Sequence, residues 1–119
     1  MAVSESYRDF VLEQLGRVRP VTPRRMFGGV GLYADGAFFG LIDNDTLYFK
    51  TGDLNRGDYE ARGQPPFRPF GPEARPMSYH EVPGDVLEDL RQLEAWFARA
   101  VAVAEEAGRR RTRRERPGR

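Results

Sequence analysis

The single histidine is the residue best suited to acid–base chemistry, and the sequence around it does not complete a catalytic site. His80 follows Ser78 by two residues, which would place both side chains on the same face of a β-strand. A serine nucleophile needs a base within hydrogen-bonding reach and an acid that orients this base. The sequence offers no orienting acid in that pattern, so we interpret His80 as a polar strand residue.

Glycines at positions 29 and 31, together with Ala34, match the dinucleotide-binding pattern G-x-G-x-x-A. That motif requires a strand before the glycines and a helix after them, so that the pyrophosphate meets a helix N-terminus. Here a polar Pro-Arg-Arg segment precedes the glycines and a hairpin pattern follows. We therefore interpret Gly29 and Gly31 as small residues on one strand face that leave room for a helix or a partner to approach.

Metal binding is not expected from the acidic or cysteine content of the chain. The cluster Asp43-Asn44-Asp45 would need a glycine at the sixth and a glutamate at the twelfth position to form a calcium loop, but Tyr48 and Leu54 stand there. The cluster therefore predicts a hairpin turn. The absence of cysteine excludes disulfides, cysteine nucleophiles and cysteine-containing zinc sites. We expect no cofactor and no enzymatic activity.

Charge is distributed unevenly along the chain. The formal net charge is +1, yet residues 108–119 contain seven arginines and one glutamate, so the preceding residues are net acidic. A basic segment of this kind suits a polyanion, and its lack of aromatic residues indicates phosphate contacts rather than base stacking. The candidate nucleic-acid-binding residues are Arg24, Arg25, Arg109, Arg110, Arg111, Arg113, Arg114 and Arg116. The alternative is a disordered, solubilising terminus for the tail and surface ion pairs for Arg24 and Arg25.

The elements that would hold these residues follow from periodicity and turn signals. Ser6 predicts the N-cap of a first helix that ends before Pro20. Asp35-Gly36 predicts a two-residue hairpin turn. In the third strand, Leu47 and Phe49 are expected to face the core, whereas Tyr48 and Lys50 face the other way. The predicted ranges are a helix over 6–18, strands over 26–34, 37–43 and 46–51, a helix over 53–62, and strands over 67–70 and 77–82.

A closing helix is predicted over residues 85–107, with Gly108 as its end. We therefore expect one domain over residues 1–107, followed by a basic disordered tail over 108–119. The order α-β-β-β-α-β-β-α predicts an α+β fold, in which an antiparallel sheet has its helices packed on one face. The sequence has neither a secretion signal pattern nor a long apolar run, so we expect a cytoplasmic protein with no membrane partner.

Several spaced motifs together resemble the TfoX/Sxy N-terminal domain family. They are Arg25-Met26-Phe27-Gly28-Gly29-Val30-Gly31-Leu32-Tyr33, Asp35-Gly36, Phe39-Gly40-Leu41-Ile42, Leu47-Tyr48-Phe49-Lys50-Thr51, Met77-Ser78-Tyr79 and a closing helix with Trp96 and Ala100. The resemblance implies a secretion-chaperone-like α+β fold and a homodimer. It also implies kinship with regulators of DNA-uptake competence that work with a transcription activator. We expect a single-domain member without the helical C-terminal domain of the two-domain regulators.

These observations predict a non-enzymatic regulatory or adaptor domain that acts through protein contacts in transcription regulation. The candidate partner-binding residues are Met26, Phe27, Gly28, Gly29, Gly31, Tyr48 and Lys50. One alternative is a sequence-independent nucleic-acid binder, with DNA or RNA held by the arginine-rich tail. A second alternative is a small-molecule site or an enzyme on the glycine-rich strand, which would use Lys50, Tyr48 and His80.

Overall fold

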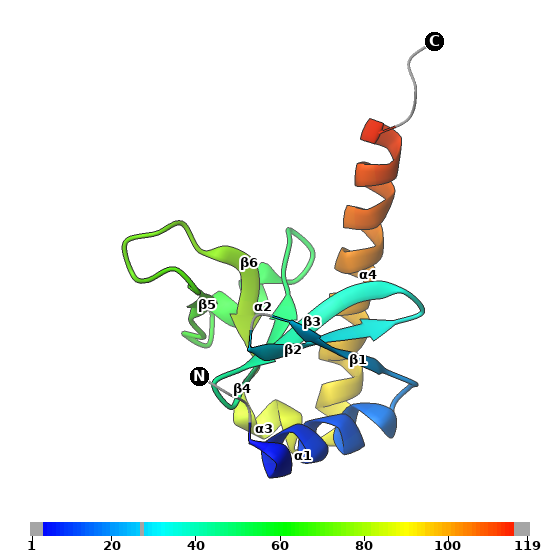
Figure 1. The fold of residues 1–119 in the computed structure, drawn as a ribbon, viewed down its shortest axis with the longest axis vertical. Helices are drawn as coiled ribbons and strands as arrows, with labels where there is room; N and C mark the ends of the chain where they lie inside the picture. The colour runs from blue at the N-terminus through cyan, green and yellow to red at the C-terminus, as the bar shows by residue number, and fades with distance from the viewer. Residues whose placement is uncertain (1–3, 27, 116–119) are drawn as a thin grey trace.

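The computed structural model describes the backbone of residues 4–26 and 28–115, and the side chains of these residues up to Arg113. The helices and strands follow one another as α1 (Glu5–Gly16), β1 (Thr22–Met26), β2 (Gly29–Ala34), β3 (Ala37–Asp43), β4 (Thr46–Lys50), α2 (Arg56–Glu60), β5 (Pro66–Phe67), β6 (Met77–Glu81), α3 (Gly84–Leu87) and α4 (Leu90–Glu115). Figure 1 shows the strands in the middle, α1 and α3 at one end, and α4 running past the sheet to a projecting end.

The strands form one six-stranded sheet in the order β1-β2-β3-β4-β6-β5, and each neighbouring pair is antiparallel. Three hairpins build the first four strands, because residues with positive φ stand at each turn: Gly28, Asp35 with Gly36, and Asn44 with Asp45. Helix α4 packs on β3 and β4. The predicted α+β class, with an antiparallel sheet and helices, is confirmed.

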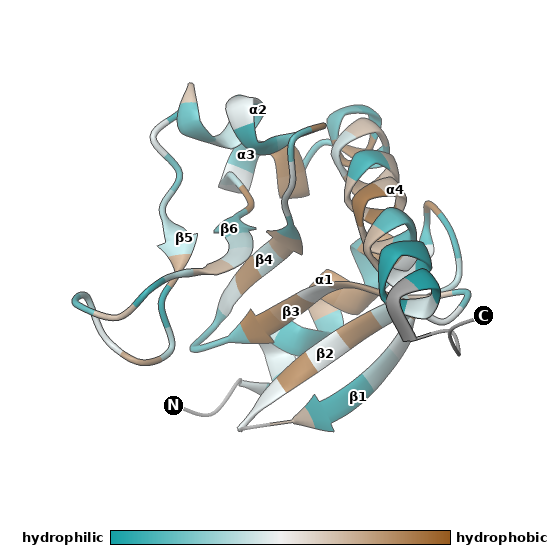
Figure 2. Ribbon diagram, turned by 90° about the horizontal axis from the view of Figure 1, so that it is seen from above, coloured by the Kyte–Doolittle hydropathy of each residue, from teal (hydrophilic) through white to brown (hydrophobic). Residues whose placement is uncertain are grey.

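Alternation along the strands separates a helix-covered face from an open face. The covered face holds the core, and its fully buried residues include Leu32, Phe39, Ile42, Leu47 and Phe49. Phe97 of α4 stacks on Phe39 with a ring-centroid distance of 4.5 Å. Figure 2 shows apolar residues along the central strands and the facing part of α4, whereas the far end of α4 is hydrophilic. The inward direction predicted for Leu47 and Phe49 is confirmed, as both are buried while Tyr48 and Lys50 are only partly buried.

A β-bulge in β3 lets both faces carry an aromatic residue from adjacent positions. Leu32 pairs with Gly40 and Tyr33 pairs with Phe38, so Phe39 is the extra residue. Phe39 therefore points into the core while Phe38 stays on the open face next to Tyr33. Gly40 is needed beside the bulge, because a Cβ there would lie 2.7 Å from the backbone oxygen of Tyr48.

The N-terminal half departs from prediction at two places. The polar segment before Met26, for which no strand was predicted, is strand β1, and the predicted strand over 26–34 is divided at Gly28 between the end of β1 and β2. β1 is an edge strand whose residues are mostly exposed, so it lacks the apolar alternation that reveals a strand. The first helix is capped by Ser4 rather than Ser6, because the Ser4 hydroxyl accepts a hydrogen bond from the Tyr7 backbone N–H.

The closing helix begins near the predicted position but differs from the prediction at two places. Asp89 interrupts it, because the Asp89 carboxylate accepts hydrogen bonds from the backbone N–H groups of Arg91 and Gln92 and so begins α4 as a separate helix. Helix α4 then continues through Gly108 to Glu115, so residues 108–115 are helical rather than disordered. The Glu106 carboxylate accepts hydrogen bonds from Arg109 and Arg110, three and four positions later, which stabilises this end of the helix.

Candidate functional site

A row of aromatic and cationic side chains crosses the open face of the sheet. Tyr33 and Phe38 are stacked with ring centroids 5.0 Å apart, and Phe38 lies 5.7 Å from Tyr79. Cations flank the row: the Arg24 guanidinium lies 5.6 Å from the Tyr33 ring, and the Lys50 ammonium lies 4.9 Å from the Tyr79 ring. Five strands contribute to this row, which we call the aromatic row. Its cation–π contacts hold the charged groups against ring faces.

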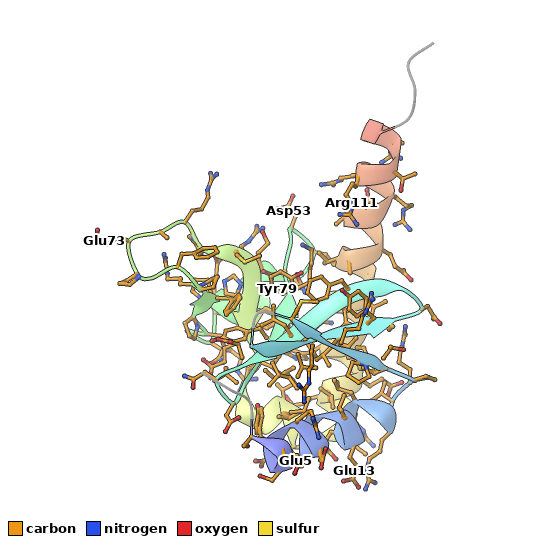
Figure 3. The ribbon with its side chains drawn as sticks, viewed as in Figure 1. Glu5, Glu13, Asp53, Glu73, Tyr79 and Arg111 are labelled. Carbon is orange, nitrogen blue, oxygen red and sulfur yellow. The ribbon has the colours of Figure 1, made fainter. Side chains whose placement is uncertain are left out.

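Four of these residues converge on a groove between the sheet and the far end of α4. Tyr33, Phe38 and Tyr79 line one wall together with Lys50, and residues of α4 between Ala104 and Arg113 line the other. The groove has a volume of about 920 Å³. This is the upper part of the size range for ligand pockets, roughly 300–1,000 Å³. In Figure 3, Arg111 lies on the projecting part of α4 and Tyr79 lies in the sheet below it.

Small residues of α4 form the second wall of the groove. Ala104, Ala107 and Gly108 follow a helical repeat and line the groove, and their small side chains leave space above the sheet. Arg111 continues the same stripe and brings a positive charge to the groove. On the sheet side, Asn55 fixes the end of β4, because its side-chain amide donates a hydrogen bond to the Lys50 carbonyl at 3.0 Å.

The electrostatics of the groove favour an anion. Partial burial lowers the pKa of Lys50, and the nearby positive charge of Arg111 lowers it further. Burial raises the pKa of Tyr79 to about 12, and Tyr33 adds to this shift while Arg111 opposes it. Four cations line the groove, Lys50, Arg109, Arg111 and Arg113, against the two carboxylates of Asp35 and Glu105. Like charges brought together in this way are relieved by a bound anion.

Glu106 organises the other arginines of the helix end. Its carboxylate forms ion pairs with Arg109 at 2.8 Å, with Arg110 at 3.3 Å and with Arg113 at 3.9 Å. All three arginine side chains remain more than half exposed. The helix end therefore presents a preformed cationic surface, in which the arginine side chains are held by a common ion-pair partner.

The predicted nucleic-acid-binding residues fall into two groups. Arg109, Arg110, Arg111 and Arg113 lie on the end of α4; Arg114 lies in the same helix, and Arg116 is outside the described residues. Arg24 belongs to the aromatic row through Tyr33. Arg25 alternates with Arg24 along β1 and pairs with Val30, so its side chain is on the other face of that strand.

The predicted partner-binding residues are only partly brought together. Met26 packs over Gly31, where a Cβ would lie 2.5 Å from the methionine Cε atom. Gly29 is close to the backbone oxygen of Ile42, and Gly28 forms the turn with φ of +81°. The space expected above these glycines is thus filled by the chain itself, at Gly31 by Met26 and at Gly29 by Ile42. Phe27 lies outside the described residues.

The two remaining candidates, Tyr48 and Lys50, lie in different surroundings. Lys50 lines the groove, whereas Tyr48 packs on Phe67 with ring centroids 4.7 Å apart and is absent from the groove lining. Tyr48, Lys50 and His80 therefore do not line a common pocket, which the small-molecule alternative would require. His80 is on the covered face and shares a 2.9 Å hydrogen bond with the Thr51 hydroxyl. Burial lowers the pKa of His80.

Other kinds of site receive no support from the described residues. Gly29 and Gly31 lead into the β2–β3 hairpin instead of a helix, so a dinucleotide site lacks its helix N-terminus. Among residues 4–26 and 28–115, no three histidine or acidic side chains gather as a metal site would require. Within the same residues, no helix combines the length and apolar character needed to cross a bilayer.

Sequence reasoning missed Tyr33, Phe38 and Tyr79 as residues of a site. One signal was available, because a two-residue turn at Asp35-Gly36 pairs Ala34 with Ala37 and therefore places Tyr33 opposite Phe38. Tyr79 gave no such signal. It reaches the row because β6 pairs with β4, a contact between strands that are distant in sequence.

The comparisons with known proteins identify the family of the chain. No curated protein matches the chain. The family model described as TfoX N-terminal domain matches residues 13–104 of the 119 residues, which includes every strand and most of the core. Arg109, Arg110, Arg111 and Arg113 lie beyond the matched range. The match covers well over half of the sequence, and the chain therefore belongs to the TfoX N-terminal domain family.

Proposed function

We propose that this domain is a non-enzymatic regulatory domain that binds nucleic acid through the basic end of α4, largely independently of sequence. The observation that carries this proposal is that residues 108–115 continue a helix. The side chains of Arg109, Arg111 and Arg113 therefore project from a helix next to Lys50. Regulation is the role that family membership favours.

Arginine-rich helix ends suit phosphates for two reasons. Each guanidinium donates hydrogen bonds in a planar fork that matches phosphate oxygens. Neutralising phosphates also releases condensed counterions, so binding weakens steeply as salt rises. The exposed guanidinium groups of Arg109, Arg110 and Arg113 can make such contacts without leaving the helix.

Fluorescence anisotropy of the full chain with labelled DNA and RNA at two salt concentrations tests the proposal. In one variant, Arg109→Gln, Arg110→Gln and Arg113→Gln remove three charges from the helix end. A control variant removes three exposed arginines elsewhere, by Arg17→Gln, Arg75→Gln and Arg91→Gln. We expect the first variant to lose most of its binding and the slope of log K against log salt to fall by about two to three. An equal loss of binding in both variants would mean that net charge, and not the helix end, determines binding.

A second candidate is a protein adaptor in transcription regulation, and a different surface favours it. The loop between β5 and β6 carries Phe70 with 81% of its surface exposed, and Met77 at the start of β6 is 43% exposed. Exposed large apolar residues on one projecting segment are typical of protein interfaces. Pull-downs with the wild-type chain and with Phe70→Ser test this. A transcription-related partner held by the first and lost by the second supports the adaptor, and identical recoveries contradict it.

A further inference from the structure

We infer that the groove between α4 and the aromatic row holds an unpaired base of a single-stranded nucleic acid, so that the domain prefers single strands to duplexes. This inference rests on the proposed function and specifies its partner. It gives the aromatic side chains a role that the arginines of the helix end alone do not require.

The first argument comes from the aromatic residues. Tyr33 and Phe38 are half-buried, so each keeps ring surface toward the groove that it lines. Because the two rings stack on each other at 5.0 Å and Arg24 lies over the Tyr33 ring, the row turns ring edges and the remaining uncovered ring surface toward the groove. An aromatic edge packs well against the face of another π-system, and every base has such a face, so the row can hold a base of any identity.

The second argument comes from the position of the cations. Lys50 and Arg111 approach the groove from its two sides, one from the sheet and the other from the helix. A nucleotide carries its phosphate a short distance from its base, so a base on the aromatic wall would place the phosphate within reach of these groups. The remaining phosphates of a strand would lie along the exposed arginines of α4.

The third argument separates single strands from duplexes. In a duplex the faces of each base are covered by its neighbours, so a base can enter a recess only after unstacking and unpairing. That cost is smaller for a single strand. The groove lies between two elements of the fold, so a duplex could contact only the arginines on its rim.

The groove also disfavours the alternative of an acidic peptide. A peptide carboxylate would satisfy Lys50 and Arg111 equally well, but it offers no planar ring for Tyr33 and Phe38. Cations and aromatic rings interleaved in one recess are typical of single-strand binding. Competition by an acidic peptide is therefore an informative outcome of the test.

The experiment compares a labelled short oligothymidine with the corresponding duplex by fluorescence anisotropy, using the full chain. We expect tighter binding of the single strand, and we expect Tyr33→Leu to weaken it about tenfold while the duplex is little affected. Tyr48→Leu is the matched control, because Tyr48 is a half-buried aromatic residue outside the groove. Circular dichroism checks folding, and Phe38→Leu repeats the test if Tyr33→Leu does not fold.

The outcomes separate this inference from the proposed function. Loss of single-strand binding in Tyr33→Leu but not in Tyr48→Leu supports a base in the groove. Equal binding of both nucleic acids, or no change in Tyr33→Leu, overturns the inference and leaves phosphate binding by the arginines in place. Displacement of the oligonucleotide by a poly-glutamate peptide at similar concentration overturns it as well. No binding of either nucleic acid refutes the proposed function itself.

Discussion

The two faces of the sheet use aromatic residues in different ways. On the covered face, Phe39, Phe49 and Phe97 are completely buried, and each lies within 6 Å of the others by ring centroid. On the open face, Tyr33 and Phe38 remain half-buried, and the aromatic row is flanked by Arg24 and Lys50. Burial from water explains the first set. It explains the second only in part, because these rings have retained surface that a ligand could cover.

With the proposed binding site on the open face, this difference would separate stability from binding within one small sheet. Neighbouring residues of one strand lie on the two faces, as Phe38 and Phe39 do in β3. Substitutions on the two faces should therefore change different measurements, and the following predictions test that separation.

The largest effect is expected from Phe97→Ala on the covered face. Removing this ring leaves a cavity against Phe39 and Phe49, and we expect the free energy of unfolding to fall by about 3–5 kcal/mol. Urea unfolding followed by circular dichroism measures it. Tyr33→Leu on the open face should lose less than about 1.5 kcal/mol. Similar losses in the two variants would contradict a division between the faces.

The next largest difference is expected between two glycines of β2. A Cβ at Gly29 would collide with the backbone oxygen of Ile42, whereas one at Gly31 would meet the mobile end of Met26. We expect Gly29→Ala to lower the free energy of unfolding by about 1–3 kcal/mol and Gly31→Ala to lower it by less. Thermal unfolding of both variants checks the order. A larger loss for Gly31→Ala would show that Met26 cannot move aside.

Acidification should weaken the covered face at His80. Burial lowers the pKa of this residue in the folded chain below its ordinary value of 6.5, so the unfolded chain binds a proton more readily. The stability that neutral His80 contributes is therefore fully present above pH 6.5 and declines as the pH falls below that value. Urea midpoints over this range should fall in the wild-type chain and stay flatter in His80→Gln. If the wild-type chain and His80→Gln show parallel pH profiles, the decline comes from titratable groups other than His80.

The smallest effect is expected on the charged end of α4. Glu106 pairs with Arg109, Arg110 and Arg113, so Glu106→Gln should leave more guanidinium charge available to phosphates. We expect nucleic-acid binding to tighten roughly two- to fivefold. Glu94→Gln, an exposed residue near the start of α4, is the control for net charge. Equal tightening in both variants would show that the ion pairs do not limit binding.

The elements that could be predicted are those whose signal is local. The Asp35-Gly36 turn was recognisable because both residues adopt positive φ, 50° and 83°, which this residue pair tolerates. The inward and outward directions along β4 followed from strict alternation. Strand β1 escaped prediction because an exposed edge strand has no apolar face to reveal it.

The groove could not be predicted, because its walls meet only in the folded chain. Lys50 was predicted to lie on the outward face of its strand, but its neighbours Tyr79 and Arg111 come from β6 and α4, which the sequence does not bring near it. The continuation of α4 was missed for a related reason. A glycine and a run of arginines indicate the end of a helix locally, and the side-chain pairs of Glu106 with the arginines outweigh that signal here.

The bulge at Phe39 has a consequence for how β3 tolerates insertion and deletion. An ordinary one-residue deletion reverses the orientation of every side chain beyond it, because strand residues alternate. Deleting Phe39 would instead restore regular pairing, with Phe38 still opposite Tyr33 and Gly40 still opposite Leu32. The core would lose one ring, and the aromatic row would keep its register. A shortened β3 would thus preserve the aromatic row while sacrificing stability, and a related chain without the bulge would align with a one-residue gap at this position.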